Sequence, residues 1–310
     1  MTTPSYENSA RNLWYPGHML KAEISMKESL ALVDLVVILL DARAPLSTRN
    51  PRLERRLITR PHAIIANKAD LANATQSRKW EEWFTQHDEA VDFLDASKLR
   101  HPETLVNHWR DFVLAERKKR GATRPLLRPV RVMIVGIPNI GKSTLVNRLK
   151  LKNVAKVANH PGVTRSNQWV NLAGGQVELL DTPGVLWPQL RDKEHELLLT
   201  ALGNIPDDST DPVLTAGFLI QRLQQLPIRN PLQKLDLPEI SDNPQEVLEA
   251  FANRRNMLMP GGRPNVNKAA QTILKAFRAG QLGYFTLETP PAEDVMEPED
   301  NDPENAETRI

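Results

Sequence analysis

Residues 136–144, with the sequence GIPNIGKST, have the types and spacing of a phosphate-binding loop. They match the pattern G-x-x-x-x-G-K-[ST] and lie between an apolar run at 130–135 and a helical pattern at 142–150. Gly136 and Gly141 permit backbone conformations that strain other residues, which lets successive N–H groups face the phosphates at a positive helix end. A glycine turn that binds no ligand would need neither the preceding strand nor the following helix. The expected nucleotide contacts here are Pro138, Asn139, Ile140, Gly141, Lys142, Ser143 and Thr144.

Five residues could supply the chemistry of phosphate transfer around Mg²⁺. Lys142 should reach the β- and γ-phosphates, and the Ser143 hydroxyl is suited to Mg²⁺. The motif DTPG ends an expected strand at 176–181, where Asp181 could hold Mg²⁺ through water and the Gly184 N–H could bond the γ-phosphate. Between these motifs, the hydroxyl and carbonyl of Thr164 could complete the shell of the metal and the γ-phosphate.

The base is predicted by the stretch HAIIANKADL at 62–71, which contains the pattern N-K-x-D. The carboxylate of Asp70 can accept hydrogen bonds from guanine N1–H and the 2-amino group together, whereas adenine offers neither donor. Asn67 can either bond the guanine edge or brace the phosphate loop, while the stem of Lys68 covers the ring. A looser match, DASK at 95–98, could bring the N–H of Ala96 or Ser97 to guanine O6. The expected ligand is therefore GTP or GDP, and an ATPase is disfavoured.

The elements that must position these motifs alternate between strands and helices. Strands are predicted at 34–41, 62–66, 91–95, 130–135, 167–172 and 176–181. Helical patterns are predicted at 17–32, 50–60, 75–86, 102–119 and 142–150. Several strands are nearly continuous apolar runs, which is typical of strands that are covered on both faces. The prediction is an α/β domain with a mixed six-stranded sheet and helices on both faces.

Beyond about residue 186 the strand pattern stops. Helices are predicted at 194–202, 211–225, 244–257 and 266–279, with Ala270, Ile273, Leu274 and Phe277 on one face of the last. Residues 286–310 contain nine acidic residues and one arginine, which leaves the rest of the chain basic. We therefore predict a GTPase domain at 12–190, a small all-α domain at 191–286 and an acidic, disordered tail at 287–310.

The motifs occur in a rotated order, with the base motifs before the phosphate loop and the Mg²⁺ motif. In an open α/β sheet, ligands bind outside the carboxyl ends of the strands, whatever the order in which the strands are connected. The sequence therefore predicts a circularly permuted P-loop GTPase domain, with the ordinary termini joined through the connector at 117–131. The segment after DTPG then leads directly into the all-α domain, which would couple a phosphate-sensing loop to that domain.

Composition narrows the setting of this activity. The chain has 310 residues and no cysteine, which excludes disulfides and thiolate catalysis. The N-terminal residues have no signal-peptide pattern, and the longest apolar run, LVVILL at 35–40, is too short to cross a bilayer. We expect a cytoplasmic monomer that binds neither membrane nor DNA.

The motifs WYPGHMLKA at 14–22, DARAPLSTRNP at 41–51, NKAD, GIPNIGKST, PGVTRS and DTPG together resemble the YlqF/YawG family of permuted GTPases. The resemblance covers about residues 12–286. It implies a factor that binds a maturing large ribosomal subunit, contacts ribosomal RNA and hydrolyses GTP slowly, with stimulation by the ribosome. Guanine nucleotide, Mg²⁺ and K⁺ are the implied cofactors.

Two residue roles, one catalytic and one in binding K⁺, follow only from this resemblance. Val185 occupies the place of the water-orienting Gln of Ras-like enzymes, so the resemblance assigns that role to His18. It also assigns K⁺ coordination to Asn139. A structural role for His18 at a helix start, and a turn role for Asn139, are the alternatives.

Other readings of the function stay open at this point. One is a GTPase switch that acts on a protein partner, and another is an RNA-binding scaffold with a structural nucleotide. A basic face on the last helix could contact RNA or could be an ordinary solvated face, and the same holds for RKKR at 117–120. Trp80 and Trp83 are expected in the core. The basic residues in question near the last helix are Arg263, Lys268, Lys275 and Arg278.

Overall fold

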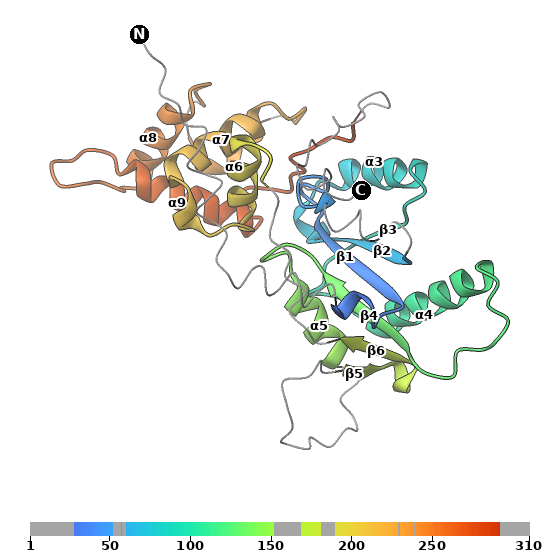
Figure 1. Ribbon diagram of the computed structural model, residues 1–310. Coiled ribbons are helices and arrows are strands. Elements are labelled where there is room, and N and C mark those ends of the chain that lie inside the picture. The colour runs from blue at the N-terminus through green and yellow to red at the C-terminus, as the bar shows by residue number, and fades with distance from the viewer. Residues whose placement is uncertain are drawn as a thin grey trace, which may run out of the picture.

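The computed structural model describes residues 28–51, 57, 60–151, 169–180, 190–228, 230–237 and 240–291. Its centre is a six-stranded sheet with the order β3-β2-β1-β4-β6-β5 (Figure 1). All neighbouring strands are parallel except β5, which pairs antiparallel with β6. The predicted strands are confirmed as β1 (Leu35–Asp41), β2 (His62–Asn67), β3 (Val91–Leu94), β4 (Val130–Val135), β5 (Trp169–Leu172) and β6 (Val177–Leu180).

Helices cover both faces of this sheet, as predicted. Successive side chains of a strand point to opposite faces, so β1 contributes to two apolar clusters. Val36, Ile38 and Leu40 pack with Trp80 and Phe84 of α3 (Ala74–Gln86). On the other face, Leu35, Val37 and Leu39 belong to the cluster that contains Trp109 of α4 (Pro102–Lys119) and Leu145 of α5 (Lys142–Leu151). Trp80 is fully buried, which confirms its place in the core.

The helical domain consists of α6 (Lys193–Leu202), α7 (Pro212–Gln224), α8 (Pro244–Arg254) and α9 (Val266–Arg278). Each helix begins after a side chain that accepts a hydrogen bond from its first turn, which satisfies a backbone N–H that has no partner within the helix. These capping residues are Asp192, Asp211, Asn243 and Asn265. The apolar face predicted for α9 is buried. None of the helices in the described part of the chain is long and apolar enough to span a membrane.

The chain beyond α9 returns to the sheet domain, and we call residues 281–288 the strap (Figure 1). Its Phe285 N–H donates to the Leu71 carbonyl (3.1 Å), and its Leu287 N–H donates to the Arg43 carbonyl (2.6 Å). The carboxylate of Glu288 accepts from the backbone N–H groups of residues 46 and 47. The start of the predicted tail at 287 therefore needs correction, because Leu287 is 1% exposed and Glu288 is bonded into the GTPase domain.

Candidate nucleotide site

The carboxyl ends of β1, β2 and β4 lie side by side, and Asn67 at the end of β2 joins three of the predicted motifs. Its amide nitrogen donates to the carbonyl of Ile140 in the phosphate loop (2.8 Å), and its amide oxygen accepts from the N–H of Ala96 (2.9 Å). The side chain is buried, so both bonds are shielded from water. Of the two roles predicted for Asn67, the structure shows the bracing one. The base motif, the DASK segment and the phosphate loop, which occur in a permuted order along the chain, therefore meet at the carboxyl edge of the sheet.

Lys68 adds a second bridge between the base motif and the phosphate loop. It adopts a left-handed backbone conformation (φ 60°) at the start of the short helix η1 (Ala69–Leu71). Its ammonium donates to the carbonyl of Asn139 (3.0 Å) and lies 3.0 Å from a carboxylate oxygen of Asp41. Lys68 thus links the loop that would read the base to the loop that would bind the phosphates.

The phosphate loop is held in a shape that needs glycine. Gly141 has φ +108°, and a Cβ there would lie 2.1 Å from the amide nitrogen of Asn67. A Cβ on Gly136 would lie 2.8 Å from the carbonyl oxygen of Leu39. No side chain fits at either contact, so the two glycines of the motif allow the loop to pack closely against β1 and β2.

Lys142 lies against the loop that it is predicted to serve. Its ammonium donates to the carbonyls of Gly136 (2.8 Å) and Ile137 (2.7 Å). Burial lowers the pKa of Lys142 to about 8. Phosphate oxygens would replace neutral carbonyls with charged acceptors, which are the stronger partners of an ammonium.

Ser143 and Thr144 are exposed residues at the start of α5. Within the described residues, neither hydroxyl has a hydrogen-bond partner, so both are available to a ligand. A hydroxyl oxygen at a helix N-terminus, beside an ammonium, is the donor set that suits a Mg²⁺-bound polyphosphate. The remaining predicted contacts lie outside the described residues: His18, Thr164, Asp181 and Gly184.

Asp70 is engaged by a lysine that the sequence analysis does not assign. The ammonium of Lys98 lies 2.8 Å from one oxygen of Asp70 and 3.0 Å from an oxygen of Asp95. The hydrogen bonds to these two carboxylates, together with their charges, raise the pKa of Lys98. Lys98 is the last residue of the DASK motif. The expected position of this motif beside the base motif is the sequence feature that could have indicated its contact with Asp70. Guanine would have to compete with this ion pair for the carboxylate.

The N–H groups predicted to meet guanine O6 have partners inside the protein. The Ala96 N–H donates to Asn67, and the Ser97 N–H donates to Asp95 (2.8 Å). The DASK segment is therefore placed beside the base motif as predicted, but both N–H groups are directed to other acceptors in this structure. Contact with O6 would need a local rearrangement.

The helical domain contacts the phosphate loop directly. The amide nitrogen of Asn139 donates to the carbonyl of Gly203 (2.9 Å), and the amide nitrogen of Asn204 donates to the carbonyl of Pro138 (3.0 Å). Gly203 ends α6 in the left-handed conformation. Two hydrogen bonds thus tie the end of α6 to the loop, a contact that crosses domains and is invisible in local sequence patterns.

Known proteins share both the sequence and the fold. Ribosome biogenesis GTPase A of Bacillus cereus is 35% identical over 277 residues, which covers 89% of this chain and 93% of the relative. The crystal structure of GNP-bound YlqF from T. maritima is similar with a TM-score of 0.64 at 26% identity, covering 89% of this chain and all of that chain. The chain belongs to the YlqF family of circularly permuted GTPases.

A mitochondrial relative and a family model also match this YlqF-family chain. Mitochondrial ribosome-associated GTPase 1 of Mus musculus is 31% identical over 294 residues, with 89% of each chain covered. A family model described as 50S ribosome-binding GTPase matches residues 131–215. Membership of the YlqF family makes this chain a GTP-hydrolysing enzyme that works with guanine nucleotide and Mg²⁺.

Proposed function

We propose that this GTPase is an assembly factor for the large ribosomal subunit, and that its nucleotide state controls binding to the precursor particle and its RNA. The names of its relatives, which refer to ribosome biogenesis, and the description of the matching family model, which refers to 50S binding, support this role. The contact of the helical domain with Pro138 and Asn139 of the phosphate loop supports the coupling most directly. A change at the phosphates would alter the surface on which the helical domain rests.

In the proposed site, Asp70 reads guanine once Lys98 has been displaced. Lys142 binds the β- and γ-phosphates, and Ser143 supplies a hydroxyl to Mg²⁺ together with Asp181 and Thr164. The Gly184 N–H bonds the γ-phosphate. His18 orients the attacking water, and the amide oxygen of Asn139 contributes to a K⁺ site.

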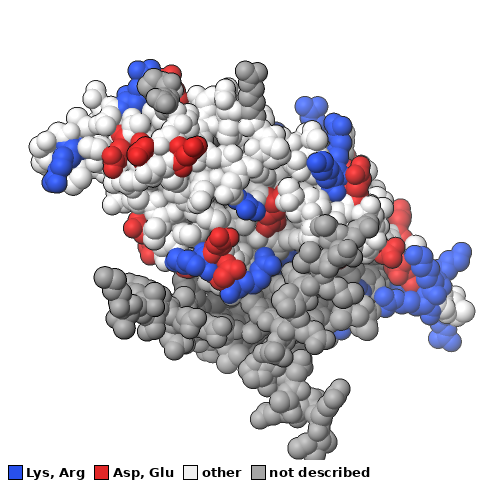
Figure 2. Space-filling model, turned by 90° about the horizontal axis from the view of Figure 1, so that it is seen from above, with Lys and Arg blue, Asp and Glu red and all other residues white. Residues whose placement is uncertain are grey.

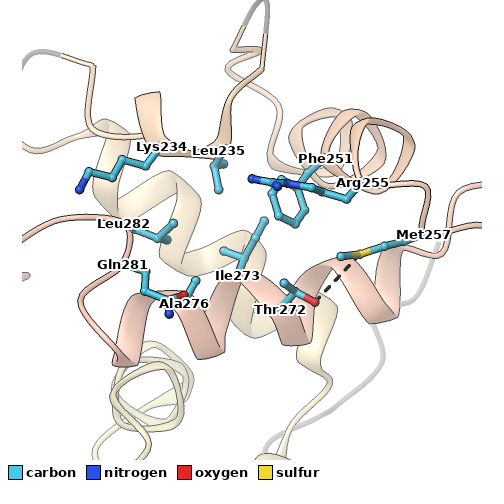
Figure 3. Close-up of a pocket in the computed structure, with 10 residues that line it drawn as sticks. All are labelled: Lys234, Leu235, Phe251, Arg255, Met257, Thr272, Ile273, Ala276, Gln281 and Leu282. Carbon is cyan, nitrogen blue, oxygen red and sulfur yellow. Dashed lines mark hydrogen bonds between the residues drawn. The ribbon is translucent and has the colours of Figure 1, made fainter.

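A cavity in the helical domain is the proposed RNA contact. It has a volume of about 370 Å³ and lies between α8, α9 and the turn at 233–235 (Figure 3). Met257 and Ala276, both half-buried, form part of its apolar lining, while the cations of Lys234 and Arg255 flank it. An unstacked base fits an apolar wall, and its phosphates fit the two cations.

Among the basic residues at the surface, the RKKR segment is a second proposed RNA contact, whereas Arg278 is no longer a candidate. Exposed basic side chains of the RKKR segment gather at the end of α4 (Figure 2). Arg278, by contrast, donates to the carbonyls of Thr200 and Ala201 and pairs with Asp207. It therefore holds α9 against α6, and the predicted basic face for RNA is correspondingly smaller.

The assembly role is tested by GTP turnover with and without the large-subunit precursor, in KCl and in NaCl. We expect slow turnover alone and faster turnover with the precursor in KCl, and Lys142→Ala serves as the inactive control. Equal rates in all four conditions would contradict both the ribosome and the potassium assignments. Co-purification with a protein complex that resists RNase would instead favour a protein partner. GTP that stays intact for hours with the precursor would favour a scaffold with a structural nucleotide.

The RNA contact is tested by a charge-reversed pair, Lys234→Glu with Arg255→Glu. We expect weaker binding to precursor RNA and a shallower dependence of affinity on salt, because two phosphate contacts are lost. The matched control reverses Arg78 and Lys79, two exposed basic residues on α3, with the same change of net charge. Equal losses in the two double variants would show a general charge effect and no specific site.

A further inference from the structure

Asp41, the last residue of β1, is a fully buried carboxylate next to the base motif. It is paired in the sheet with Asn67, and its two oxygens accept from the guanidinium of Arg43 at 2.9 and 2.8 Å. The ammonium of Lys68 lies 3.0 Å from the same carboxylate. One buried acid therefore holds two cations, one of which belongs to the N-K-x-D motif.

These charges are ionised in spite of their burial. Burial opposes the charged form of Asp41, but Arg43 and Lys68 outweigh it and hold the pKa of the carboxyl well below its usual range. A buried ion of this kind is stable only while its partners stay in place. The geometry of Asp41 and its two cations is consequently fixed as a unit.

Arg43 extends this unit into the helical domain. Its guanidinium donates to the carbonyl of Leu202 at the end of α6 (3.3 Å) and lies 5.4 Å from the centre of the Phe277 ring on α9. Its own carbonyl accepts from Leu287 of the strap. The ring of Phe277 also stacks with the ring of Phe285 in the strap (6.5 Å). Arg43 thus contacts both the helices and the strap.

The other end of the unit is the base-reading loop. Lys68 stands two residues before Asp70, at the start of η1. The carbonyl of Leu71, at the end of η1, accepts from Phe285 of the strap. The loop that carries Asp70 is therefore held on one side by Asp41 through Lys68, and on the other side by the strap.

We propose that Asp41 and Arg43 are positioning residues that transmit the placement of the helical domain to the base-reading loop, so that guanine selectivity depends on contacts outside the nucleotide site. This inference rests on the proposed role of Asp70 as the group that reads guanine. It makes the helical domain a determinant of which base is bound, and not only a platform for a partner.

The experiment compares the affinities of GDP and IDP for the full chain by calorimetry. Inosine lacks the 2-amino group of guanine, so the ratio of the two affinities reports how well Asp70 is placed, whereas partial unfolding lowers both affinities equally. The test variant is Phe277→Leu, which removes the ring beneath Arg43 and keeps an apolar side chain. The matched control is Phe251→Leu, because Phe251 is also buried and lies 5.6 Å from the guanidinium of Arg255, within the helical domain alone.

We expect Phe277→Leu to lower the GDP:IDP affinity ratio by about threefold or more, in the range typical of residues that couple distant sites. Phe251→Leu should leave the ratio unchanged. An unchanged ratio in both variants, or an equal fall in both, would overturn the proposal. If Phe277→Leu does not fold, Arg43→Lys keeps the charge, loses the two-pronged contact with Asp41, and should lower the ratio in the same way; an unchanged ratio there would also overturn it.

Asp70→Asn tests the base-reading role of Asp70 separately from the transmission by the helical domain. It should lower the GDP:IDP ratio directly, by removing the acceptor of the 2-amino group. If Asp70→Asn leaves the ratio intact, the assignment of the base-reading carboxylate fails. If Asp70→Asn lowers the ratio and Phe277→Leu does not, only the transmission from the helical domain fails.

Discussion

The phosphate end and the base end of the nucleotide site are built in different ways. Within the described part of the chain, the phosphate end is one continuous segment, 136–144, which contains both motif glycines and the lysine. The base end is assembled from three separated segments, around Asp41, Asn67 and Asp95, and it is further held by the strap. A contiguous motif carries its geometry in its own backbone, whereas an assembled one depends on the tertiary structure around it.

At each end, the charged group that is expected to bind the nucleotide already contacts another group of the protein. Lys142 donates to loop carbonyls, and Asp70 pairs with the exposed Lys98. The partners differ in strength, because the Lys142 contacts are partly buried whereas Lys98 is exposed and its ion pair is screened by water. The comparison therefore predicts larger effects of substitution at the phosphate end than at the base end.

The largest effect is expected for Lys142→Ala. Each hydrogen bond from the ammonium to a charged phosphate oxygen is worth about 1.5–3 kcal/mol, so losing two should weaken GTP binding by at least about 100-fold. Calorimetric titration measures this directly. Lys79→Ala, a change of an exposed lysine on α3, is the control and should bind as the parent does. Near-parental affinity of Lys142→Ala would remove the phosphate assignment.

Gly141→Ala tests whether the two ends share one structural brace. The left-handed strain of an L-residue alone costs about 1–2 kcal/mol. At Gly141 the added Cβ would also displace the Asn67 amide, so the loss in free energy of unfolding should exceed that strain. Gly121→Ala is the matched control, because Gly121 has φ +80° and an added Cβ would meet nothing within 4 Å. Equal losses in denaturant titrations of both variants would mean that the brace adds nothing to stability.

The pH dependence of binding sharpens the account of Lys142. Its pKa of about 8 in the folded chain lies below the unfolded value of 10.5. Between these values the unfolded chain holds more protons, so this lysine makes the free energy of unfolding rise with pH in that window. Phosphate favours the charged ammonium, so GDP binding at pH 8.5 should take up protons.

Calorimetry in buffers of different ionisation enthalpy measures this uptake. Lys142→Arg should reduce it, because arginine stays protonated throughout the range. Zero proton uptake by the parent chain would contradict the claim that burial lowers the pKa of Lys142 in the nucleotide-free chain.

The smallest effect is expected for Lys98→Ala. Removing this lysine frees Asp70 for the base, so GTP affinity should rise, by less than about fivefold because an exposed ion pair is weak. Equilibrium binding at low and high salt measures the change, and the gain should shrink as salt screens the ion pair. A large loss of affinity would mean that Lys98 contacts the nucleotide itself.

Local patterns predicted the sheet, its helices and the motifs. Continuous apolar runs, turn residues and the phosphate loop each consist of residues that are adjacent in the sequence. They also predicted that permuted motifs would meet at one edge of the sheet. Asn67 shows this most clearly, since its amide joins the loop at Ile140 to the segment at Ala96.

Contacts between distant segments were not predictable in this way. Glu288 looked like part of an acidic tail, yet it caps backbone N–H groups near Ser47. Arg278 looked like a surface base on α9, yet it fixes that helix to the end of α6. Asp41 and Arg43 contributed only to the family resemblance. Asp41 and Arg43 lie two residues apart, but their other partners, Lys68 and Leu202, lie far along the chain. The partners of Glu288 and Arg278 are also distant, so no local spacing reveals these pairings.

The most direct test of a single guanine site built from permuted motifs is calorimetric titration of GTP and ATP, with Mg²⁺, into the parent chain and into Asp70→Asn. We predict that the parent prefers GTP by at least about tenfold, the effect of one charge-assisted hydrogen bond, and that Asp70→Asn erases most of this preference. ATP bound as tightly as GTP by the parent, or a full GTP preference in Asp70→Asn, would contradict the account.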